Sequence, residues 1–91
     1  MKKFLLGTNW KMNKTLADGL EYTNTLMNII EQYSQFEFFI IPPYTHLWKI
    51  KEAIDSKKSP LKLGAQNMHY ENAGQFTGEI SPVMLKEIGV N

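Results

Sequence analysis

A chain of 91 residues is long enough for one small domain and too short for two. Its 43% hydrophobic and 21% charged residues exclude a disordered chain and match a soluble globular protein. A formal net charge of +1 provides no general attraction for nucleic acid or an acidic membrane, and the absence of cysteine excludes disulfides. The first apolar run, 4–6, is too short for a signal-peptide core or a membrane span, so we expect a cytoplasmic protein.

The first half of the chain alternates strand and helix patterns. The apolar run 3–8 is typical of a strand buried on both faces. From Leu16 the apolar residues recur at steps of three, four and seven, which predicts a helix with Thr15 as its N-cap. The aromatic and β-branched run 36–41, stopped by two prolines, predicts a second strand.

The second half continues the alternation with one long interruption. The pattern predicts a helix over 45–55, a strand over 61–65 and a polar loop over 66–78. Ser81, followed by proline, is the expected N-cap of a last short helix that Gly89 ends.

This order of elements implies right-handed βαβ units and a parallel sheet. Ligands of such α/β folds bind at the carboxyl ends of the strands. We therefore expect the functional residues in the segments 8–13, 42–46 and 66–78.

Lys11 is the main chemical candidate in the first of these segments. A lysine after a strand can hold a phosphate or carboxylate as a compact cation, oriented by an amide such as that of Asn9. The alternative is a solvated surface lysine beside an interfacial Trp10. The local sequence leaves both interpretations open.

The sequence motifs around these residues indicate a function more specifically than the position of Lys11 after a strand does. Gly-Thr-Asn-Trp-Lys-Met-Asn at 7–13 resembles the opening motif of the triose-phosphate isomerases. The two prolines at 42–43, Gly-Ala-Gln-Asn at 64–67 and Gly-Gln-Phe-Thr-Gly-Glu-Ile-Ser-Pro at 74–82 are similar to later motifs of that family, in its order and spacing. The resemblance implies a TIM (β/α)8 barrel of about 250 residues. Residues 1–91 would be the N-terminal portion of that single domain, about its first three βα units.

The resemblance also implies an activity and its residues. The family's members are aldose–ketose isomerases of glycolysis and gluconeogenesis, which convert glyceraldehyde 3-phosphate to dihydroxyacetone phosphate through an enediolate without a cofactor or metal. Lys11 would be catalytic and substrate-binding, because a fixed cation stabilises the charge that develops on the enediolate oxygen. Asn9 would bind the substrate oxygen and orient the lysine, and Trp10 would pack between a helix and the barrel.

The long loop 67–79 resembles the family loop that inserts into a neighbouring subunit. Thr77 matches the threonine at its tip, and Phe76 would pack beside it. The resemblance thus implies a homodimer for the complete protein, and the alternative is an exposed, mobile loop. Further expected interface residues are Met12, Tyr44, His46, Gln66, Asn67 and Glu79.

Two catalytic groups of the family have no counterpart here. Its histidine electrophile follows the fourth strand and its glutamate base follows the sixth, whereas this chain reaches only Asn91. We expect the 91-residue chain to be inactive alone. His46 and His69 lie outside the matching motif and are expected at the surface or in an interface.

Other functions remain as alternatives. Gly-Thr at 7–8 and the segments 14–17 and 64–69 are similar to a paralogous branch that isomerises four-carbon ketose phosphates such as erythrulose phosphate. A second alternative is a non-catalytic βαβ fragment that needs a complementing chain and exposes unpaired strand edges and apolar faces. Binding to nucleic acid or a membrane is not expected, because only scattered lysines favour it: Lys2, Lys3, Lys57, Lys58 and Lys62.

Overall fold

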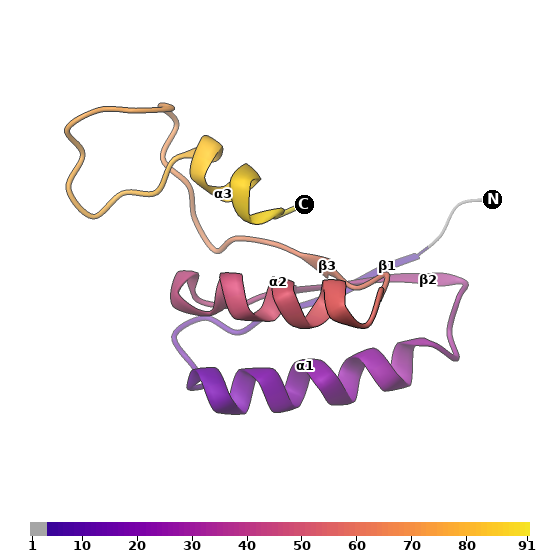
Figure 1. Ribbon diagram of the computed structural model, residues 1–91. Helices are drawn as coiled ribbons and strands as arrows, with labels where there is room; N and C mark the ends of the chain where they lie inside the picture. Colours follow the sequence, from indigo (N-terminus) through magenta and orange to yellow (C-terminus); the bar gives the residue numbers. More distant parts are fainter. Residues whose placement is uncertain (1–3) are drawn as a thin grey trace.

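The computed structural model describes residues 4–91, so Lys2 and the expected start of the first strand at Lys3 lie outside it. The described chain forms a parallel sheet with two helices on one side and a third near the chain's end (Figure 1). The elements in order are β1 (Phe4–Asn9), α1 (Leu16–Ile30), β2 (Phe36–Ile41), the 3-10 turn η1 (Tyr44–His46), α2 (Leu47–Ser56), β3 (Lys62–Leu63) and α3 (Pro82–Ile88). The predicted alternation and the parallel sheet are confirmed.

The sheet has the strand order β1-β2-β3. β1 and β2 pair along six residues, from Phe4 opposite Phe36 to Asn9 opposite Ile41. Because these strands are parallel and in register, their carboxyl ends lie at the same edge. The segments that follow them therefore begin side by side.

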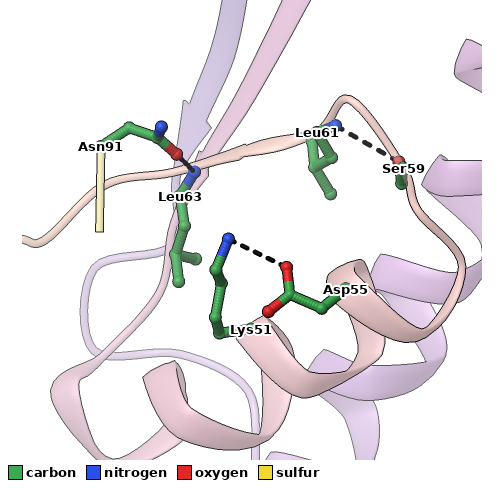
Figure 2. A network of polar contacts seen from close by, with 6 residues as sticks. All are labelled: Lys51, Asp55, Ser59, Leu61, Leu63 and Asn91. Atoms are coloured by element: carbon green, nitrogen blue, oxygen red, sulfur yellow. Dashed lines mark hydrogen bonds and ion pairs between the residues drawn. The ribbon is translucent and has the colours of Figure 1, made fainter. Parts of the chain in front are cut away.

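β3 is shorter than the predicted strand over 61–65. The backbone N–H of Leu61 donates to the Ser59 hydroxyl at 3.2 Å, and this local bond precedes the pairing with β2 (Figure 2). Only Lys62 and Leu63 pair as a strand, and Gly64 adds one bond to the Ile40 carbonyl at 2.9 Å. The prediction was too long because it counted apolar residues without these competing partners.

The ends of two helices follow the predicted capping residues. The Thr15 hydroxyl accepts a hydrogen bond from the backbone of Asp18 at 3.3 Å, and α1 begins at the next residue. Ser81 caps α3 in the same way, with Pro82 as the first helical residue. Gly89 then leaves the helix in the left-handed conformation, at φ +100°.

The core lies between the sheet and the helices α1 and α2. These two helices run along the same side of the sheet (Figure 1). Each fully buried aliphatic side chain in such a core stabilises the fold by roughly 1.5–3 kcal/mol. The buried hydrophobic side chains of these elements are Met27, Ile30, Ile40, Leu47, Ile50, Ile54 and Leu63.

The edge strand β1 is far more exposed than predicted. Phe4, Leu5 and Leu6 remain 73%, 59% and 46% exposed. The prediction of a strand buried on both faces is therefore wrong for the described residues, because β1 has only β2 as a neighbouring strand. The exposed apolar side chains agree instead with the expectation that part of a barrel exposes strand edges and apolar faces that the remaining strands would cover.

No helix within residues 4–91 combines the length and apolar character that crossing a membrane requires.

Candidate functional site

The segments that follow the three strands enclose one open hollow. Its volume is about 390 Å³, and it lies at the carboxyl edge of the sheet where the fold predicts a ligand site. All three predicted segments contribute to its wall. The lining residues are Lys11, Met12, Asn13, Lys14, Thr15, Pro43, Thr45, His46 and Gln66.

Lys11 adopts a strained backbone conformation beside this hollow. Its φ is +56°, in the left-handed region that costs an L-residue about 1–2 kcal/mol. Two hydrogen bonds hold it there: its N–H donates to the Asn9 carboxamide oxygen at 2.8 Å, and its carbonyl accepts from Gln66 Nε2 at 2.7 Å. The structure thus brings together the two residues predicted to bind substrate and adds Gln66 to them.

Gln66 joins the ends of all three strands. Besides the Lys11 carbonyl, its Nε2 donates to the carbonyl of Ile41, the last residue of β2, at 3.2 Å. The sequence placed Gln66 only among the interface residues. The missed signal was a carboxamide directly after the third strand, where it can reach the neighbouring strand ends.

Trp10 is buried between the sheet and α1, as predicted. It is 4% exposed and meets Tyr22 edge to face, with ring centroids 5.3 Å apart. Gly19 of α1 allows this approach, since a Cβ there would lie 2.8 Å from the indole ring. The buried ring fixes the residue that precedes Lys11.

His46 was expected at the surface or in an interface; it is not a surface residue, because only 7% of it is exposed. Its Nε2 lies 2.8 Å from the carbonyl oxygen of Lys14, and its Nδ1 lies 2.8 Å from the Thr45 hydroxyl. Because a carbonyl only accepts, Nε2 carries the hydrogen. His46 therefore fastens the segment after β1 to η1.

His69 lies in the long loop and is partly buried. Its ring packs against Phe76 and Tyr70, with centroid distances of 4.2 and 4.5 Å, and its Nδ1 is 3.9 Å from a Glu79 carboxylate oxygen. The backbone N–H of His69 also donates to the Ile80 carbonyl at 2.8 Å. These contacts close the loop on itself.

The segment between β3 and α3 makes a wide excursion away from the sheet (Figure 1). It carries several predicted interface residues: Asn67, Phe76, Thr77 and Glu79 are exposed, as is Met12 in the segment after β1. Tyr44 of η1 anchors the base of this loop through a hydrogen bond from its hydroxyl to the Asn67 carbonyl. Burial raises the pKa of Tyr44 and the negative charge of Glu79 raises it further, whereas the backbone of Asn67 lowers it in part.

Two lysines are among the residues that line the hollow. Within 4–91 no three histidine, aspartate or glutamate side chains gather closely enough to hold a metal ion. Lys11 and Lys14 both line the hollow, and a lysine ammonium can hold a phosphate. The Lys14 ammonium lies over the rings of Trp10 and Tyr22, 5.8 and 4.9 Å from their centroids, which leaves Lys11 as the candidate.

Parallel strands in sequential order that alternate with helices, with polar segments beyond the strand ends, are the arrangement of the first units of a βα barrel. The sequence model of the triosephosphate isomerase family matches residues 4–91. The chain belongs to the triosephosphate isomerase family, and the described elements are the first βα units of its barrel.

Individual relatives carry two different names. The chain is 44% identical over 89 residues to an L-erythrulose-1-phosphate isomerase of Mesorhizobium japonicum, an alignment that covers 97% of this chain and 34% of that protein. It is 46% identical over 91 residues to a triosephosphate isomerase of Alkaliphilus metalliredigens, covering 100% of this chain and 36% of that protein. A triosephosphate isomerase of Carboxydothermus hydrogenoformans is 42% identical over 90 residues, covering 99% and 35%. The chain thus spans about a third of the length of these relatives.

Proposed function

We propose that this chain is the N-terminal part of an aldose–ketose isomerase of phosphorylated sugars, with Lys11 as a catalytic residue. The observation that carries the proposal is the backbone of Lys11, which Asn9 and Gln66 hold in a left-handed conformation at the carboxyl edge of the sheet. Strain of this kind persists where the surrounding structure holds it, and it concentrates at active sites.

The chemistry of isomerisation fits these groups. Moving a proton between the carbonyl carbon and its neighbour passes through an enediolate, whose oxygen gains negative charge. A lysine ammonium fixed beside that oxygen stabilises the charge without reorganising. The Asn9 oxygen is occupied by the Lys11 N–H, so its NH₂ group is free to donate to a substrate oxygen.

Residues 1–91 would supply the electrostatic part of the site within a single barrel domain. Enolisation also needs a general base and an electrophile, which we assign to the part of the barrel that follows these residues. The 91-residue chain is accordingly expected to have no isomerase activity alone and to need a complementing chain.

Glyceraldehyde 3-phosphate and dihydroxyacetone phosphate are the first expected substrate pair. A four-carbon ketose phosphate is the second candidate, because a relative named L-erythrulose-1-phosphate isomerase is 44% identical and those named triosephosphate isomerase are 42% and 46% identical. One additional carbon changes binding by only about 1–3 kcal/mol, so few contacts separate the two.

The complete protein is proposed to be a homodimer. The loop between β3 and α3 offers the exposed side chains of Phe76 and Thr77, while Tyr44 and the contacts of His69 hold its base and shape. A preshaped loop loses less conformational entropy on binding a second subunit than a disordered one would.

The test is an isomerase assay of a completed barrel. Residues 1–91 are continued by the part of the Alkaliphilus metalliredigens relative that follows the matched segment, and both the triose and the tetrulose phosphates are offered. We expect turnover of one or both, and a loss of roughly 100- to 1000-fold in kcat for Lys11→Met. The matched control is Lys58→Met, which replaces another exposed lysine with positive φ far from the hollow. A folded barrel that turns over neither substrate would overturn the proposal.

A further inference from the structure

The strained backbone of Lys11 needs an external support. Asparagine tolerates the left-handed region through its short polar side chain, and glycine does so because it lacks a Cβ. Lysine has neither feature. Its φ of +56° must therefore be held by neighbouring groups. A lysine that slipped back to ordinary φ would point its side chain elsewhere, so the support also decides where the ammonium lies.

One support is local and the other comes from a distant part of the chain. The Asn9 oxygen accepts from the Lys11 N–H, and Asn9, only two residues away, is the last residue of β1. The Lys11 carbonyl is held by Gln66, which follows it by 55 residues, at a donor–acceptor distance of 2.7 Å. The first bond ties Lys11 to the end of its own strand, β1, and the second ties it to the segment that follows β3.

The same carboxamide nitrogen is anchored to the sheet. Gln66 Nε2 has two hydrogens, one for the Lys11 carbonyl and one for the Ile41 carbonyl at 3.2 Å. Ile41 ends β2, and its carbonyl also accepts the backbone N–H of Trp10 at 3.0 Å. Gln66 thus connects the strained residue to the central strand of the sheet.

We infer that Gln66 is a positioning residue for the proposed isomerase site, one that sets the place of the Lys11 ammonium through the Lys11 carbonyl. This inference rests on the proposed function of Lys11. It gives Gln66 a task beyond the subunit interface that the sequence suggested, and it requires a side chain of this length with two N–H donors at one end.

The first experiment compares Gln66→Met with Asn67→Ala in the completed barrel. Methionine keeps the length of the side chain and removes both donors. Asn67 is the matched control, because it is the next residue in the same exposed loop, yet its carboxamide oxygen accepts only from the Met68 N–H. Both positions belong to the proposed interface, so sedimentation at the assay concentration separates any loss of dimer from a loss at Lys11.

We expect Gln66→Met to lower kcat by roughly 10- to 100-fold, with a smaller rise in KM, since a misplaced catalytic group costs rate of this order. Asn67→Ala should stay within about twofold of the parent in kcat. Equal kcat values for the two variants at equal dimer content would overturn the inference. An inactive but folded parent would instead overturn the proposed function of Lys11.

For Gln66→Glu the readout is the pH dependence of kcat relative to the parent, which would not change if Gln66 had only a structural role. Near neutral pH its ionised carboxylate has no donor and faces two carbonyl oxygens, so kcat should be low. As the pH falls and the carboxyl is protonated, one O–H donor returns, and kcat relative to the parent should recover in part. The same ratio for Gln66→Met should not change with pH, and dividing by the parent removes the titration of every other group.

The near-isosteric glutamate variant also carries the test alone if the methionine variant does not fold. A Gln66→Glu variant that keeps the kcat of the parent at the alkaline end of the range, where its carboxyl is ionised, would show that no donor is needed at this position, and the inference would be wrong.

Discussion

The strands β1 and β2 have similar apolar sequences and opposite surroundings. β2 has a strand on each side, and its Ile40 is completely buried under the helices. β1 has one neighbour, and its Phe4 and Leu5 are more than half exposed. The difference shows that an apolar run predicts burial in the complete fold. The described residues alone can leave such a run exposed.

The contrast continues through the molecule. The side of the sheet facing α1 and α2 forms a closed core, whereas the edge of β1 and the loop before α3 present apolar side chains to solvent. Exposed apolar surface of this extent usually marks a face meant for other protein segments. Substitutions in the closed core, in β1 and where the two regions meet test how far the regions differ.

Truncating a side chain in the closed core should be far more damaging than truncating one on β1. Ile50 is fully buried, so Ile50→Ala should lower the free energy of unfolding by about 2–5 kcal/mol. Leu5→Ala, at a site 59% exposed, should change it by less than about 1 kcal/mol. Urea unfolding of the 91-residue chain, followed by circular dichroism, measures both.

The same pair sharpens the comparison in the completed barrel. There Leu5→Ala should approach the cost of Ile50→Ala, because additional strands would cover β1. Similar costs for the two variants in the 91-residue chain would show that β1 is already as well packed as the core.

Gly19→Ala tests how tightly the closed side is packed around Trp10. Alanine normally stabilises a helix interior relative to glycine by about 1 kcal/mol. Here the new Cβ would lie 2.8 Å from the buried indole, so we expect a net destabilisation of about 1–3 kcal/mol from overpacking. Thermal unfolding measures the sign, and Asn28→Ala at an exposed position of α1 is the control, expected to be neutral or stabilising. A stabilised Gly19→Ala variant would mean that Trp10 can move aside.

Tyr44 lies where the two regions meet, and its effect should be the smallest. Its raised pKa means that the folded chain favours the neutral phenol. The resulting contribution to stability is fully present below the ordinary pKa of 10.0 and is lost as the pH rises through the raised value. The stability of the parent should therefore fall more steeply in this alkaline range than that of Tyr44→Phe. Unfolding curves across the range measure it, with Tyr70→Phe as the control at a tyrosine 80% exposed; parallel curves for the parent and Tyr44→Phe would contradict the expectation.

The features that the sequence predicted to the residue depend on local chemistry. Thr15 and Ser81 cap helices through a backbone group three residues away, and Gly89 ends a helix through its own φ. In each of these contacts the donor and the acceptor lie within a few consecutive residues, so a local sequence pattern is sufficient to predict it.

The features that the sequence missed join distant segments. His46 is buried because it bonds to a carbonyl 32 residues earlier, and Gln66 reaches a carbonyl 55 residues earlier. Both acceptors are backbone carbonyls, which every residue has, so the sequence does not indicate where these bonds form. The local pattern alone also left Lys11 between a ligand site and a surface lysine, and the resemblance of the surrounding motif favoured the first.

The burial of Trp10 has a practical consequence for following this site. The only other tryptophan, Trp48 on α2, is 56% exposed, whereas Trp10 is 4% exposed and immediately precedes Lys11. Replacing Trp48 by phenylalanine would leave a single indole in an apolar environment. Its fluorescence would then serve as an intrinsic optical reporter, in which a shift of emission to longer wavelength signals that the segment after β1 has opened to water.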